Sequence, residues 1–173
     1  MKLLKKILKT MLIVIMFLVI GFIGLIVYAV ISDYKPDEKE VVFSSENPDK
    51  INDTLELSLL TWNIGYCGLD KEMDFFYDGG TKVKTPEPKF IENLAQVMRF
   101  LKQNDSIDFI LIQELDKRSK RSYYLNEYDS LGRAMEGYHS FFAKNYDVFF
   151  VPVPPADPMG KVLSGLTIFS KYQ

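Results

Sequence analysis

The chain has 173 residues, 47% hydrophobic and 25% charged, which is long enough for one folded core and too short for two globular domains. Four of its 21 basic residues precede Ile31 and all 23 acidic residues follow it, so the remainder carries a formal charge of −6. That charge works against a nucleic-acid binder, whose affinity comes from basic groups that neutralise phosphates. The single cysteine, Cys67, excludes an intramolecular disulfide and leaves the redox compartment open.

Residues 11–31 form an unbroken run of 21 apolar residues and glycines without a charge. At about 1.5 Å per residue, a helix of this length spans the hydrocarbon core of a membrane. Four lysines lie in the basic end, residues 1–10, so the positive-inside rule keeps the N-terminus cytoplasmic and the rest of the chain extracytoplasmic. A cleaved signal peptide is the alternative. The run is long for one, and residues 28–32 lack a small-x-small site, which favours a single-pass signal anchor in the cell membrane.

Residues 32–54 are rich in Asp, Glu, Lys, Ser, Asn and Pro, a composition typical of a solvated linker. A short edge strand at residues 41–43 is the alternative. A folded domain is expected over residues 55–173.

Two apolar runs in this domain end in polar side chains. Residues 58–64 are strand-like with Asn63 near their end, and residues 108–114 end at Glu114. A buried strand delivers such a side chain to the edge of its sheet. We therefore predict that Asn63 and Glu114 lie at the ends of two buried strands.

The stretch between these runs predicts a helix. Thr85 can cap a first turn that tolerates prolines, and the helix ends at residues 104–105. Its apolar stripe is expected to face the sheet: Phe90, Ile91, Leu94, Val97, Met98 and Leu101. A strand, a helix and a strand in this order predict a parallel pair that is buried on both faces.

The loops and the remaining strands complete the prediction. Residues 65–85 carry carboxylates whose spacing does not fit a calcium-binding loop, so we expect a surface loop over the cleft, with residues 75–77 filling the core. Residues 117–121 are basic and precede an amphipathic helix; they either steer an anionic substrate or form a solvated face, which is the commoner case. Further strands are predicted at residues 138–143, 147–151 and 164–170.

Three motifs follow one another along the domain: Thr-Trp-Asn-Ile at residues 61–64, Ile-Gln-Glu-Leu-Asp at 112–116 and Gly-Leu-Thr-Ile-Phe-Ser-Lys at 165–171. Together they resemble the endonuclease/exonuclease/phosphatase superfamily, metal-dependent phosphodiesterases that include deoxyribonuclease I. The resemblance covers residues 56–173. It implies an α/β (α+β) fold, the N-terminal half of a deoxyribonuclease I-like two-sheet sandwich, preceded by one transmembrane helix.

The resemblance also implies a chemistry. Glu114 is the expected carboxylate ligand of Mg²⁺ (or Mn²⁺), Asn63 adds its amide oxygen, and Asp116 orients the neighbourhood. Without the resemblance, a Glu after a strand is often a solvent-facing cap and an Asn near a Gly is often a turn. The implied substrate is a phosphoester: a nucleic acid, a phospholipid or a sugar phosphate. The negative charge of the domain favours a small or membrane-embedded one.

The superfamily's catalytic His, the Asp that orients it and an Asp-x-Asn pair belong to the second half of its domain, and none can be assigned here. His139, the single histidine, lies in a predicted strand and is expected to be structural. We therefore expect a truncated member, inactive or weakly active alone, or one that another chain completes, with an apolar sheet face exposed. The alternatives are a non-catalytic membrane-tethered interaction module and an extracytoplasmic α/β domain that shares only strand-end residues with the superfamily.

Overall fold

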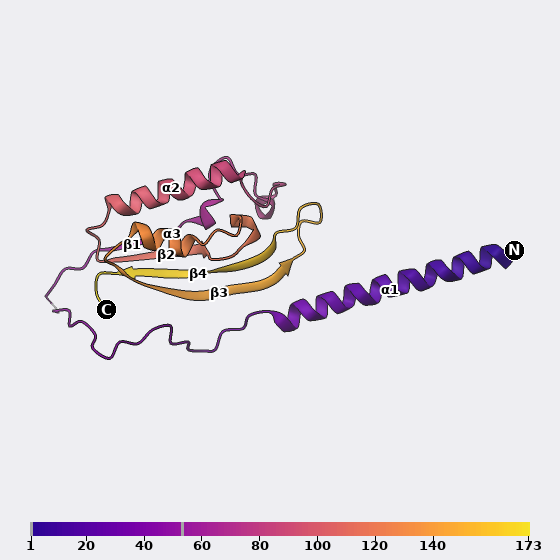
Figure 1. The fold of residues 1–173 in the computed structure, drawn as a ribbon, viewed down its shortest axis with the longest axis horizontal. Coiled ribbons are helices and arrows are strands. Elements are labelled where there is room, and N and C mark those ends of the chain that lie inside the picture. The colour runs from indigo at the N-terminus through magenta and orange to yellow at the C-terminus, as the bar shows by residue number, and fades with distance from the viewer. Residues whose placement is uncertain (1, 53) are drawn as a thin grey trace. The chain divides into compact units, whose positions relative to one another are not determined.

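The computed structural model describes residues 2–52 and 54–173, which divide after residue 33 into two compact units. The first unit is one helix, α1 (Lys2–Ser32). The second is a mixed α/β domain, whose described residues form one four-stranded sheet (Figure 1). The predicted α/β class and the N-terminal apolar helix are confirmed.

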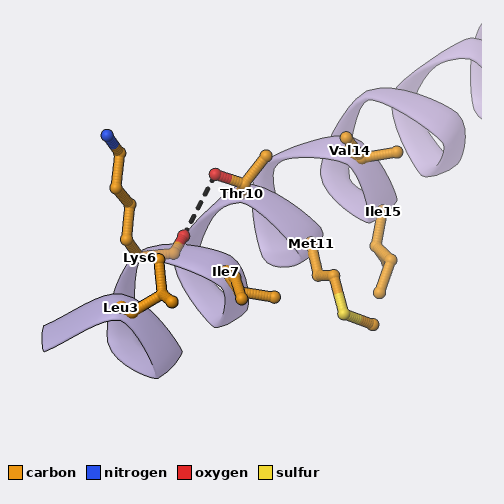
Figure 2. A pocket seen from close by; sticks show the side chains of 7 residues that line it. All are labelled: Leu3, Lys6, Ile7, Thr10, Met11, Val14 and Ile15. Atoms are coloured by element: carbon orange, nitrogen blue, oxygen red, sulfur yellow. Dashed lines mark hydrogen bonds between the residues drawn. The ribbon is translucent and has the colours of Figure 1, made fainter. Parts of the chain in front are cut away.

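The helix α1 contains the predicted apolar segment and extends it back through the basic end. None of its described side chains is buried. By length and composition it could cross a membrane or act as a signal anchor. A hollow along its first turns is lined by α1 alone, as Figure 2 shows, so it is the outer surface of one helix and not an enclosed site: Leu3, Lys6, Ile7, Thr10, Met11, Val14 and Ile15. The Thr10 hydroxyl donates to the Lys6 carbonyl at 3.0 Å, which satisfies it within the helix.

The segment after α1 forms neither helix nor strand at residues 33–52 and 54–58. The edge strand considered for residues 41–43 is therefore wrong. The segment is nevertheless held on the domain. The Phe43 ring lies 4.5 Å from the Phe141 ring, and the Gln173 backbone N–H donates to the Asp49 carboxylate at 2.7 Å.

The sheet has the strand order β1-β2-β4-β3. Its strands are β1 (Leu59–Asn63), β2 (Phe109–Asp116), β3 (His139–Val151) and β4 (Gly160–Ser170). β1 and β2 are parallel, as predicted, and β4 runs antiparallel to both β2 and β3. The carboxyl ends of β1 and β2 therefore meet at one edge of the sheet.

The crossover between β1 and β2 is the helix α2 (Glu87–Gln103), which begins after Pro86 without a side-chain cap. The predicted Thr85 cap is wrong, because Pro86 keeps the residue before it extended and outside the first turn. Thr85 is buried, and its carbonyl accepts a hydrogen bond from the Tyr123 hydroxyl at 2.7 Å. The apolar stripe is confirmed except at Ile91, which is exposed; its buried members are Phe90, Leu94, Val97 and Leu101.

The helices α2 and α3 (Glu127–Ala134) lie on one side of the sheet (Figure 1). Their apolar faces meet β2 and β4 in the main core, which includes Phe90, Leu94, Leu101, Ile110, Ile112, Leu115, Leu131 and Phe169. On the other side of the sheet, Leu59 is 63%, Leu166 43% and Ile168 41% exposed. The parallel pair is therefore not buried on both faces as predicted, since the described helices cover one face and β1 is an edge strand.

The strand β3 is one element of 13 residues, where two strands joined by a turn were predicted. A register shift between Lys144 and Tyr146 stands in place of the turn. Such a bulge lets a strand absorb an extra residue while it continues to pair with its neighbour. β4 begins at Gly160, four residues before the predicted start at residue 164, and so pairs with most of β3.

Candidate functional site

Asn63 and Glu114 lie in contact at the carboxyl ends of β1 and β2. Asn63 is opposite Gln113 in the parallel register, which places Glu114 one residue further along the neighbouring strand. The Asn63 amide Nδ2 donates to the Glu114 carboxylate at 2.7 Å. The strand-end geometry thus brings together two side chains that are 51 residues apart in the sequence.

A bulge in β2 sets the direction of the Glu114 side chain. The pairing of β2 with β4 shifts between Ile112 and Leu115, and Glu114 has a positive φ of 53°. A left-handed backbone is uncommon for a residue other than glycine and costs about 1–2 kcal/mol. Plain alternation would put residue 114 on the same face as Ile112. The bulge instead returns Leu115 to the core and leaves Glu114 half-buried at the sheet edge.

The Asn63 side chain also stabilises the turn after β1. Its Oδ1 accepts the backbone N–H of Gly65 at 2.9 Å, while its Nδ2 faces Glu114. An Asn that bonds the backbone two residues on forms a local turn of its own. The amide oxygen expected at a cation is therefore directed at Gly65, and the amide must rotate before that oxygen faces Glu114.

Asp116 forms a buried ion pair with Arg121. Its side chain is fully buried, and its two carboxylate oxygens accept hydrogen bonds from Nε and Nη2 of Arg121, each at 2.9 Å. Its backbone N–H donates to the Glu127 carboxylate at 2.7 Å. These contacts fix the chain directly after the bulge, so Asp116 positions this part of β2 through Arg121 and Glu127.

Arg121 contradicts the expectation of a solvated basic face. Its side chain is 12% exposed, and the guanidinium carbon lies 3.8 Å from the centre of the Tyr66 ring. Burial alone would lower the pKa of Arg121, but the hydrogen bonds and charge of Asp116 raise it above its usual value. The guanidinium therefore stays charged. Nothing in the run of basic residues in the sequence distinguishes Arg121 from its exposed neighbour Arg118.

Two polar atoms beside this ion pair have no hydrogen-bond partner among the described residues: the Tyr66 hydroxyl and Glu127 Oε1. Burial, followed by the charge of Asp116, raises the pKa of Glu127 well above its usual value. Burial likewise raises the pKa of the Tyr66 phenol, against the opposing charge of Arg121. The Tyr66 phenol therefore keeps its proton at neutral pH.

Glu114 and Arg121 line the same cavity, which has a volume of about 290 Å³. Its lining comprises Tyr66, Leu69, Phe75, Tyr77, Glu114, Arg121, Asn145, Tyr146 and Ser164. Phe75 and Phe76 also pack on a second core cluster, as predicted for that loop. Tyr77 differs, because it is 64% exposed and borders the cavity. The loop thus covers the cleft with an aromatic wall.

His139 lies at the other end of the sheet. It is exposed and opposite Ser170 of β4, whereas Leu115, the residue after Glu114, is opposite Gly165. These positions are five residues apart along β4, at about 3.3 Å per residue. His139 therefore does not approach Glu114.

Across residues 2–52 and 54–173, no group of three or more His, Cys, Asp or Glu side chains is placed to hold a metal ion. The oxygen donors at the strand ends are Glu114 and, after rotation of its amide, Asn63. In comparisons with known proteins, no family model, no curated protein and no solved structure matches the chain.

Proposed function

We propose that this chain is a membrane-anchored, Mg²⁺- or Mn²⁺-dependent member of the endonuclease/exonuclease/phosphatase superfamily of phosphoester hydrolases, inactive or weakly active alone. The observation that carries the proposal is the 2.7 Å contact between Asn63 and Glu114 at the carboxyl ends of neighbouring parallel strands. Open α/β sheets bind their ligands at this end of the strands. The left-handed backbone of Glu114 adds support, because such strain collects at functional residues.

The donor atoms fit a hard cation. Mg²⁺ takes oxygen ligands, keeps several waters, and is commonly held by one or two carboxylates together with substrate phosphate. Glu114 supplies the carboxylate, and Asn63 supplies an oxygen once its amide has rotated away from Gly65. When bound, such a cation neutralises charge on phosphoryl oxygens. Asp116 stays paired with Arg121 and keeps the strand end in place.

The proposed location is the cell membrane. The helix α1 serves as a single-pass signal anchor with its N-terminus in the cytoplasm, and the α/β domain is extracytoplasmic. Nucleic acid, phospholipid and sugar phosphate all carry the phosphoester that the site would act on. The charge of −6 after Ile31 favours a small or membrane-embedded phosphoester over a nucleic acid.

The test is calorimetric binding of Mg²⁺ and Mn²⁺ to the full chain in detergent micelles. Glu114→Gln keeps the shape of the side chain but removes its charge, and should weaken cation binding about tenfold or more. Glu92→Gln is the matched control, because Glu92 lies on α2 with its side chain 58% exposed. Hydrolysis of bis(p-nitrophenyl) phosphate is measured on the same samples. Equal cation binding in the two variants, or turnover that survives Glu114→Gln, would refute the proposal.

The second candidate is a non-catalytic, membrane-tethered interaction module, which the open sheet face favours. Leu166 and Ile168 are exposed on β4, and Leu59 is exposed on β1. A partner chain with a complementary apolar sheet would cover these side chains, as in face-to-face sheet packing. A domain that sediments as a soluble monomer after removal of α1 would count against this candidate.

A further inference from the structure

Arg121 presents an unused edge to the cavity beside Glu114. Its hydrogen bonds to Asp116 and Ser164 involve Nε and Nη2. The guanidinium is planar and carries five N–H donors, so the Nη1 edge takes no part in the fork held by Asp116. The side chain is pinned by Asp116 and by the Tyr66 ring. It therefore offers donors to an anion with little loss of side-chain freedom.

The aromatic loop, residues 75–77, gives the cavity an apolar wall. Phe75 lies 6.5 Å from Tyr66 and 5.5 Å from Tyr77, measured between ring centroids. Tyr77 is the most exposed of the three and borders the cavity. A pocket with a few fixed polar groups and an aromatic wall is typical of a site for a small molecule.

We propose that this cavity binds a small phosphoester with a ring in its alcohol portion: Arg121 holds the phosphoryl group and Tyr77 packs against the ring. The inference rests on the proposed function for the role of Glu114, and it adds two residues that determine the substrate class. Arg121 is the fixed cation of the cavity, and guanidinium groups bind phosphoryl oxygens in pairs. Aromatic pairs of this kind add about 0.5–1.5 kcal/mol beyond buried area.

The size of the cavity excludes a polymer as the bound portion. Its volume of about 290 Å³ lies at the lower end of the range for small-molecule sites. It accommodates a phosphoryl group and one ring. A longer substrate, such as a lipid, would place only its headgroup in the cavity.

Charge couples this site to the cation. Asp116 offsets the charge of Arg121, and Glu114 adds a negative charge to the same cavity. A phosphoryl dianion is therefore bound weakly until a divalent cation occupies the Glu114 end. Because coupling between two ligands is reciprocal, Mg²⁺ and the phosphoester should strengthen each other's binding by the same factor.

The experiment compares phenyl phosphate with methyl phosphate by calorimetry, on the full chain in detergent micelles, with and without Mg²⁺. The unmodified chain should bind phenyl phosphate about fivefold more tightly than methyl phosphate. Tyr77→Ala should abolish this preference and leave methyl phosphate unchanged. Tyr124→Ala is the matched control, since Tyr124 is 58% exposed and does not line the cavity. Arg121→Lys keeps the charge but removes the Nη1 donors, and should weaken the binding of both esters about tenfold.

Two results would overturn the inference: equal binding of the two esters by the unmodified chain, or a preference that survives Tyr77→Ala. Ester binding unaffected by Arg121→Lys would overturn the role of Arg121. Unfolding followed by Trp62 fluorescence checks that each variant folds, and Tyr77→Ala tests the idea even where Arg121→Lys does not fold. Failure of the proposed function has a separate signature: cation binding then survives Glu114→Gln, whatever the two esters do.

Discussion

Removal of the charge of Asp116 tests whether the strand end depends on a buried ion pair. Asp116→Asn keeps the size of the side chain and one oxygen acceptor. The side chain of Asp116 is 0% and that of Arg121 12% exposed, so the variant leaves the guanidinium without its counter-ion in a buried place. Breaking a buried pair in this way costs about 3–5 kcal/mol. The retained amide oxygen favours the lower end of that range.

A loss of about 3 kcal/mol is a large part of the stability of a domain of this size, which is about 5–15 kcal/mol. We expect urea to unfold Asp116→Asn at a clearly lower concentration with an unchanged slope. The assay follows Trp62, the single tryptophan, which packs against the main core with its ring 5.0 Å from that of Phe100. Glu92→Gln breaks the exposed pair with Lys89 and should lower the urea midpoint far less than Asp116→Asn does.

The double variant Asp116→Asn, Arg121→Met measures how much of the stability comes from the interaction between these two side chains. Because it removes both charges, its loss of stability should be smaller than the sum of the two single losses. A cost below about 1 kcal/mol for Asp116→Asn would place the pair in the range of exposed ion pairs. It would refute the claim that Asp116 holds Arg121 and the chain after the bulge in place.

Three further predictions concern single side chains. Glu114→Gly should abolish cation binding yet raise the free energy of unfolding by about 1 kcal/mol, because glycine adopts the left-handed backbone without strain; a loss of stability in urea would contradict this. Burial, then the charge of Asp116, raises the pKa of Glu127 above 4.5, so its contribution to stability is complete below that pH and is lost as the pH rises towards the folded pKa. Glu127→Gln should therefore match the unmodified chain in acid, and exceed its free energy of unfolding by up to about 1.4 kcal/mol for each pH unit between 4.5 and the folded pKa of Glu127; urea unfolding across this range would reveal an opposite trend. Cys67 is 3% exposed and burial raises its pKa, so iodoacetamide should modify it only in urea, and rapid labelling of the folded chain would disprove its burial.

The elements with strong periodicity could be predicted from the sequence. The apolar run before residue 32 predicts a long helix, and the structure has α1 there. The strand, helix and strand around α2 predict the parallel pair of β1 and β2. These patterns are local, because they depend on which residues recur along one face of an element. The meeting of Asn63 with Glu114 follows from the same pattern, since parallel strands end at the same edge.

Local rules failed where a strand changes register. Two strands were predicted over residues 138–151, but pairing with β4 carries one strand through the bulge near Lys144. The burial of the parallel pair was also overestimated, since hydrophobicity does not say which face of a sheet is covered.

The sequence by itself determined the anchor-like helix, the parallel strands and the positions of the amide and the carboxylate at their ends, because each depends on spacing along the chain. Only the tertiary structure decided the backbone of Glu114, which needs the mismatch between β2 and β4. It also decided that Arg121 is buried and paired with Asp116. In the sequence, Arg121 is one of several basic residues in a run. The physical reason is that burial and charge pairing depend on contacts between segments far apart in the chain, and no local pattern records them.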